Sequence, residues 1–210
     1  IPAPVPGELI FRGDGISASF TAGVLWQPTP RWSFGASYRY SSCIDNEGDI
    51  TTQNTIPALT GRVPVSAALQ FPQYARAGVS FRPTPNWNFE VDADWTDWDN
   101  LDSVTFKGSD KLFGTDSVLP FNWKSSWLAH VGATRYLKNG WWVSGGYFFS
   151  QNSTSEKYFN PAVPDTDLHV GSLGFGHKGK RWSWALSGQI ITGSDREVNS
   201  SIFTSANGKY

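Results

Sequence analysis

The sequence predicts an all-β protein, an antiparallel transmembrane β-barrel of which about eight strands are present. Three observations predict this class: apolar residues that alternate with polar ones, short turns that alternate with long connections, and aromatic residues near the strand ends. The composition agrees, because only 17% of the 210 residues are charged and 15% are aromatic, including 11 Trp. A typical soluble domain has roughly 25% charged residues.

Two segments, 32–40 and 87–95, show the alternation most clearly. Successive side chains of a strand point to opposite faces, so each segment has one apolar and one polar or small face. Glu90, Asp92 and Asp94 share one column of the second segment, and we expect such a column on a hydrated face. The apolar columns consist of Trp32, Phe34, Ala36, Tyr38 and Tyr40, and of Trp87, Phe89, Val91, Ala93 and Trp95.

Six further segments alternate in the same way, although less regularly. The Gly-rich fifth segment is the weakest of them, with Leu173 and Phe175 as its outward pair. Together with the two clear segments they predict eight strands. In chain order the six segments are 16–26, 75–82, 123–134, 143–150, 168–178 and 182–190.

Short and long connections alternate strictly between the predicted strands. The short ones contain Pro or Asn-Gly, which suit tight turns. Transmembrane barrels have short periplasmic turns and long extracellular loops, so this asymmetry predicts which end faces outward. The short connections are 27–31, 82–86, 137–140 and 178–181, and the long segments lie near 43–70, 100–120 and 152–167.

Aromatic residues form two groups that match the girdles at the two faces of a bilayer. A soluble β-sandwich is the alternative, but it rarely has short turns at one end only. The group near the short turns is Trp26, Trp32, Phe81, Trp87, Tyr136, Trp141, Trp142 and Trp182. The group toward the loops is Tyr40, Trp95, Trp98, Phe121, Trp123, Trp127 and Phe149.

Several function classes find no support in the sequence. A net charge of −1 argues against a nucleic-acid partner, and a single cysteine, Cys43, excludes an internal disulfide. Hydrolase motifs of the types Gly-x-Ser-x-Gly and His-Glu-x-x-His do not occur. We therefore expect no enzymatic activity, no cofactor and no metal site. The aspartates Asp92, Asp94, Asp97 and Asp99 are interpreted as part of a hydrated lumen rather than as acid–base catalysts.

Several stretches resemble the FadL-type outer-membrane transporters of long-chain fatty acids and aromatic hydrocarbons. Each stretch alone is only moderately specific, but their order and spacing along nearly the whole chain agree with that family. The stretches are FTAGVLWQP at 20–28, FGASYRY at 34–40, DADWTDW at 92–98, NWKSSW at 122–127, VGATRY at 131–136 and NPAVPDTDLH at 160–169.

The resemblance implies a fourteen-stranded barrel with an N-terminal hatch and a lateral opening for hydrophobic substrates. Residues 1–210 would be a single partial barrel region, the C-terminal part, without the hatch and the final strand. The implied function is passive uptake of hydrophobic small molecules across the bacterial outer membrane by a monomer surrounded by lipid or detergent. The alternative is a small structural or adhesive eight-stranded barrel without transport.

The resemblance also implies where substrate binds. In that family a groove between extracellular loops captures the substrate, and 43–70 is placed in one of those loops. Its second half is apolar, which is typical of a binding surface or, equally, of packing against the hatch. Arg39 and Arg76 are expected on the lumen side, where they would receive a carboxylate or join Lys124 and Glu90 in a salt-bridge network. The apolar ligand-binding candidates are Ile56, Leu59, Val63, Val65 and Leu69.

Overall fold

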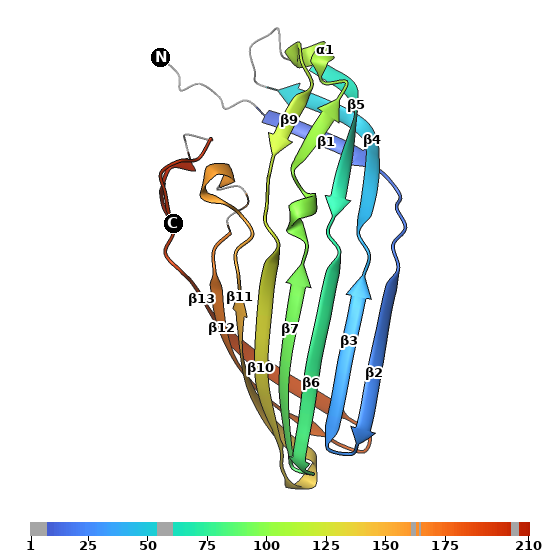
Figure 1. The fold of residues 1–210 in the computed structure, drawn as a ribbon, viewed down its shortest axis with the longest axis vertical. Helices are drawn as coiled ribbons and strands as arrows, with labels where there is room; N and C mark the ends of the chain where they lie inside the picture. The colour runs from blue at the N-terminus through green and yellow to red at the C-terminus, as the bar shows by residue number, and fades with distance from the viewer. Residues whose placement is uncertain (1–7, 54–60, 161–162, 164, 203–205) are drawn as a thin grey trace.

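The computed structural model describes residues 8–53, 61–160, 163, 165–202 and 206–210. Its main feature is an eight-stranded sheet in which each strand pairs antiparallel with the next one in the order β2-β3-β6-β7-β10-β11-β12-β13 (Figure 1). The strands are β2 (Thr21–Thr29), β3 (Trp32–Arg39), β6 (Tyr74–Thr84), β7 (Trp87–Thr96), β10 (Ser126–Tyr136), β11 (Trp141–Ser150), β12 (Leu168–Lys178) and β13 (Ser183–Gly193).

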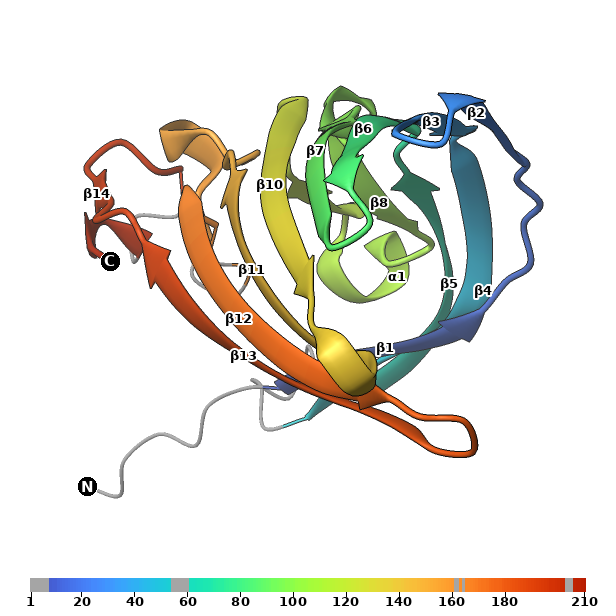
Figure 2. The same cartoon turned by 90° about the horizontal axis from the view of Figure 1, so that it is seen from below.

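The large sheet curves into an arc, as the view along the strands shows (Figure 2). Strands β2 and β13 lie at its two ends and do not pair with each other in the described residues. Every residue of both strands is exposed, on the inner as well as the outer face. The arc is therefore open, with one free edge on each side.

All eight predicted strands are present, and they are the eight strands of this sheet. Two of them begin three or more residues later than the sequence indicates: β2 begins at Thr21 rather than at residue 16, and β10 begins at Ser126 rather than at 123. In both cases the alternating pattern continues beyond the last residue that pairs with a neighbouring strand. Alternation alone cannot locate that end.

The register sorts the side chains by face. Val91 lies opposite Val79 of β6 and Val131 of β10, so the apolar columns of neighbouring strands meet on one face. Large apolar residues there are exposed, for example 54% for Val91 and 60% for Leu186. Because this face is the outer, convex one, it forms the apolar surface that a bilayer requires.

The short turns lie at one end of the sheet and the long segments at the other, as predicted, but two of the long segments contain strands that the sequence did not indicate (Figure 1). Segments 43–70 and 100–120 contain the strands of a second sheet, whose order is β1-β4-β5-β8-β9 (Figure 1). The long segment 43–70 is mainly one hairpin. The strands are β1 (Glu8–Asp14), β4 (Ser42–Gln53), β5 (Gly61–Phe71), β8 (Ser103–Lys107) and β9 (Ser117–Pro120).

Most of the smaller elements lie in or near the long connections, and one lies in a short turn. No helix in the described ranges is long and apolar enough to cross a membrane. The smaller elements are η2 (Trp98–Asn100), α1 (Asp110–Phe113), η3 (Lys138–Gly140) in a turn, η4 (Glu156–Tyr158), and the paired strands β14 (Glu197–Val198) and β15 (Gly208–Lys209).

The second sheet packs around an apolar cluster formed by Ala67, Leu101 and Val104. Trp98 and Trp123 meet edge to face in it, with ring centroids 4.9 Å apart, and Phe121 packs edge to face on Trp123 at 5.3 Å. These three aromatic residues were predicted to lie in the outer girdle, and that prediction was wrong. They pack against the buried cluster instead, because the chain between β7 and β10 contributes β8 and β9 to the second sheet.

Candidate functional site

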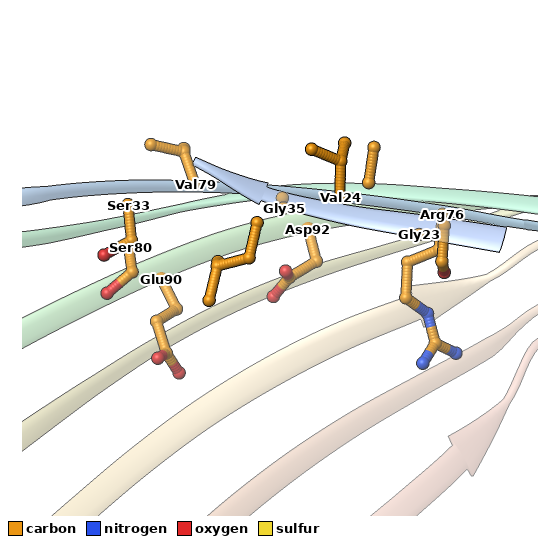
Figure 3. Close-up of a pocket in the computed structure, with 13 residues that line it drawn as sticks. Gly23, Val24, Ser33, Gly35, Arg76, Val79, Ser80, Glu90 and Asp92 are labelled. Carbon is orange, nitrogen blue, oxygen red and sulfur yellow. The ribbon is translucent and has the colours of Figure 1, made fainter. Parts of the chain in front are cut away.

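The inner face of β3, β6 and β7 presents the polar columns predicted from the alternation. Figure 3 shows Ser33, Ser80, Glu90, Asp92 and Arg76 pointing to the same side of the sheet, toward the strands across the arc. Val24 and Val79 point to the opposite side (Figure 3). The concave face is thus polar and the convex face apolar, which is the arrangement of a barrel with a hydrated interior.

Glycines open a hollow of about 520 Å³ in this wall, between β2 and β7. Gly23, Gly35 and Gly78 line it together with polar side chains and with apolar ones such as Leu25. A Cβ atom on Gly78 would overlap Oδ1 of Asp92, its register partner on β7. The carboxylate of Asp92 therefore lies over the backbone of β6, in a space that only a glycine leaves.

Arg76 is held by Asp94. Its Nε donates to Oδ1 and its Nη2 to Oδ2, both at 2.7 Å, so the ion pair is bidentate. The two residues are register partners on β6 and β7, and Asp94 is only 8% exposed. Such a forked pair fixes the guanidinium in place and satisfies both carboxylate oxygens.

A second group of polar residues continues the wall toward the short turns. Asn88 donates to Oε1 of Glu90 at 2.8 Å and accepts hydrogen bonds from Ser80 at 2.7 Å and Arg82 at 3.2 Å. Asn88 is buried and Arg82 is exposed. This connected set fixes the side chains at that end of the inner face.

The structure places Arg39 and Arg76 on the adjacent strands β3 and β6, with both on the inner face, as predicted. Arg39 is exposed and lies opposite Tyr74, nearer the long connections than Arg76. The predicted network of Arg39, Arg76, Lys124 and Glu90 does not form in the described part of the chain. Arg76 is the one member with an ion pair there, and its partner is Asp94.

Three of the apolar ligand-binding candidates lie on one face of β5. Val65 is only 5% exposed, and Leu69 packs against the cluster of Ala67, Leu101 and Val104. Val63 is half-buried. The apolar half of the segment is therefore largely packed rather than freely exposed, and Ile56 and Leu59 lie outside the described residues.

Leu101 and Val104 belong to the buried apolar cluster and were not singled out from the sequence, whereas Asp94 was singled out only as part of a hydrated carboxylate column and not as the partner of Arg76. The sequence did contain a signal for this ion pair, because the aspartate column and Arg76 lie on neighbouring alternating segments. Leu101 and Val104 had none, since their cluster forms only when separate segments meet. In the described residues no group of three His, Cys, Asp or Glu side chains is arranged to hold a metal ion.

Three comparisons relate the chain to known proteins. The model of a family described as "Outer membrane protein transport protein (OMPP1/FadL/TodX)" matches residues 9–184. A comparison with curated protein sequences gave no significant match.

Solved structures share the fold. A FadL homologue of Pseudomonas aeruginosa superposes with a TM-score of 0.76 and 20% identity, and the match covers 91% of this chain and 47% of that one. The monoaromatic hydrocarbon channel CymD superposes with a TM-score of 0.59 and 20% identity, and the match covers 89% of this chain and 52% of that one. The Pseudomonas putida toluene transporter TodX superposes with a TM-score of 0.58 and 17% identity, and the match covers 80% of this chain and 42% of that one.

The chain thus spans about half the length of the solved structures it matches. The family model covers most of the chain, and it includes the whole of β2 to β12. On this evidence the chain belongs to the family of outer-membrane transport proteins that includes FadL and TodX, and its location is the bacterial outer membrane.

Proposed function

We propose that the chain forms part of the wall of an outer-membrane channel through which hydrophobic small molecules enter passively. The observation that carries the proposal is the open arc of family strands, with an apolar outer face and a glycine-hollowed polar inner face. Two of the matched structures are described as a monoaromatic hydrocarbon channel and a toluene transporter. The proposed substrates are long-chain fatty acids or aromatic hydrocarbons.

We also propose that the full-length protein completes the wall of the channel. Within the part of the chain that the structure describes, strands β2 and β13 each have an unpaired edge, whose backbone groups hydrocarbon cannot satisfy. We place further strands of a fourteen-stranded barrel, and an N-terminal hatch, in the remainder of the full-length protein. The competing function, a small closed barrel without transport, would require β2 to pair with β13.

Substrate capture is assigned to the end with the second sheet. Ile56, Leu59, Val63, Val65 and Leu69 belong to the β4–β5 segment, and its described part lies beside the aromatic rings of Trp98 and Trp123. Burial of each methylene contributes about 0.8 kcal/mol, so an alkyl chain binds there without a charged partner. Arg39 and Arg76 are proposed as wall residues on the path inward.

Uptake of labelled toluene tests the function directly. The full-length protein is produced in cells that lack a channel of this kind, and uptake is compared with cells carrying an empty vector. We expect faster, non-saturating or weakly saturating, energy-independent entry. Equal rates in the two strains, at confirmed outer-membrane levels of folded protein, contradict the proposal.

The capture role is tested with Leu59→Asp and Val63→Asp. Both are preferred to Val65→Asp, because Val65 is buried and a charge there threatens the fold. Val118→Asp is the matched control, since Val118 is a 54% exposed apolar residue on β9. We expect slower uptake in the first two variants and unchanged uptake in the control.

A further inference from the structure

The outward face of the eight-stranded sheet carries one Lys, Arg, Asp or Glu side chain in the described strands, that of Arg135 on β10. The outward positions are those in line with Val91, because the strands pair in register. Arg135 is exposed and is the last residue but one of β10, at the end with the short turns. A cation on the lipid side costs much less near the interface than at the midplane. Its position therefore places Arg135 at the level of the lipid headgroups.

Trp87 holds the guanidinium of Arg135 in place. The two residues are register partners on β7 and β10, and Cζ of Arg135 lies 5.3 Å from the centroid of the indole ring. A cation over the face of a Trp ring is attracted by the ring. In the part of the chain that the structure describes, Arg135 has no ion pair and no side-chain hydrogen bond. Its N–H groups are therefore available to an acceptor outside the protein.

The short turns add more positive charge at this end of the sheet. Seven Lys or Arg residues lie in or next to these turns, and the same stretches contain no Asp or Glu. Two of the turns touch, because Nε2 of His177 lies 2.9 Å from the carbonyl oxygen of Asn139. A Cβ atom on Gly140 would also overlap the carbonyl oxygen of Lys178. The seven are Arg31, Arg82, Arg135, Lys138, Lys178, Lys180 and Arg181, within 27–31, 82–86, 135–140 and 178–181.

The surroundings of Arg135 do not depend on the remainder of the barrel. Strand β10 lies between β7 and β11, which the chain itself provides. The register partners of Arg135 on these strands are Trp87 and Val143, both uncharged. Further strands would join at β2 and β13, at least three strands from β10. A hatch inside the barrel would face the other side of the sheet, so neither part brings a carboxylate to this outward position.

We propose that Arg135 and the cations of the neighbouring turns bind the phosphate of an anionic phospholipid at the periplasmic surface of the outer membrane. A guanidinium presents planar pairs of N–H groups that fit phosphate oxygens. Clusters of Lys and Arg immediately beside a membrane-spanning segment attract anionic lipids. A lipid is the occupant because Arg135 lies on the lipid side, among the aromatic residues of the girdle, which a soluble periplasmic molecule does not reach. The inference does not depend on what the channel transports.

The experiment compares two lipids with the same acyl chains, dioleoylphosphatidylglycerol and dioleoylphosphatidylcholine. Both contain a phosphate, but only the choline lipid carries a cation that cancels its charge. The full-length protein is purified in a non-ionic detergent, and native mass spectrometry measures the fraction of protein that retains each lipid over a titration. We expect the glycerol lipid to bind at least about fivefold more tightly, since one Lys or Arg near an anionic surface contributes that factor.

Three variants locate the site. Arg135→Gln removes the cation of the outward face, and we expect the preference for the glycerol lipid to fall about fivefold. Lys157→Gln is the matched control and should leave the preference unchanged. Lys157 is also an exposed cation over an aromatic ring, 5.4 Å from the centroid of Tyr158, but it lies in η4, between β11 and β12 at the other end of the sheet. The double variant Lys138→Gln, Lys180→Gln lowers the charge of the turns without changing the girdle and should also weaken binding of the glycerol lipid.

Equal binding of the two lipids by the wild type overturns the inference. An unchanged preference in the folded Arg135→Gln variant does so as well, and so does an equal loss in Lys157→Gln, which would indicate an effect of net charge alone. If equimolar inorganic phosphate displaces the glycerol lipid, the cations bind a free anion and the inference is overturned. Should Arg135→Gln fail to fold, the double variant in the turns decides in its place.

Discussion

Val91 and Asp92 are neighbours on β7 in opposite surroundings. Val91 is 54% exposed on the convex face, while Asp92 lies on the inner face over Gly78. The difference arises because successive side chains of a strand alternate between faces. A single strand thus supplies both the surface toward lipid and the wall of the passage.

Arginine substitutions at these two positions measure the difference. We expect Val91→Arg to destabilise the protein in a bilayer by about 2–4 kcal/mol, the cost of a cation at the membrane midplane. Asp92→Arg is the matched control and costs much less, because its side chain stays in a hydrated space. Urea titration of the full-length protein in lipid vesicles gives both values, and equal losses would refute the assignment of faces.

Glu156 lies outside the membrane-spanning strands, and its hydrogen bonds give a prediction about pH dependence. Its carboxylate accepts hydrogen bonds from the backbone N–H groups of Asn199 and Ser200 at 2.8 and 3.0 Å, and from the Ser200 hydroxyl. These bonds, with that of Asn199 as the largest cause, lower the pKa of Glu156 below its ordinary value of 4.5. A lowered pKa means that the bonds stabilise the folded state above the unfolded pKa, and that this contribution disappears as the pH falls through the folded pKa.

Hydrogen exchange at Asn199 and Ser200 is the measurement. We expect protection of both amides to persist down to pH values near the ordinary glutamate pKa and to be lost on further acidification. Glu156→Ala should lack the protection at every pH. Protection that is independent of pH in the wild type would show that Glu156 does not hold this segment.

At the level of elements, β1 joins the second sheet through a pair of glycines. Gly13 of β1 and Gly48 of β4 are register partners. A Cβ atom on Gly48 would overlap the carbonyl oxygen of Arg12 and approach the backbone of Gly13. Since the obstacle is backbone rather than a movable side chain, the two strands approach this closely only with glycine at 48.

Gly48→Ala is therefore expected to release β1 from β4. Limited proteolysis should cut the variant between residues 8 and 14, while the eight-stranded sheet remains resistant. Gly171→Ala is the control, because nothing lies within 4 Å of the position of its added Cβ. Similar proteolysis of the wild type and Gly48→Ala would contradict the role of the close approach.

The elements that the sequence did not reveal share a physical cause. Strand β4 contains Asp45, Asn46, Glu47, Gly48 and Asp49, residue types that are depleted in strands. Strand β5 contains Pro64, which has no backbone N–H to donate. Both form because their backbones pair with each other along eleven residues, a contact that local propensity does not express.

For the whole molecule the decisive feature is the pair of free edges at β2 and β13. We expect the 210-residue chain alone not to form a stable closed barrel, because unpaired backbone groups cannot be satisfied in hydrocarbon. Refolding into detergent followed by electrophoresis with and without heating checks this. A heat-resistant, protease-resistant monomer would favour the small closed barrel instead.

The sequence by itself determined the fold class, the eight spanning strands and the two faces of the sheet. These follow from alternation and turn chemistry, which are local and are written in each segment separately. The tertiary structure decided the features that depend on contacts between distant segments. These are the second sheet, the cluster around Leu101 and Val104, and the ion pair of Arg76 with Asp94. Asp94 and Arg76 are 18 residues apart, and only the register of β6 against β7 brings the guanidinium to the carboxylate.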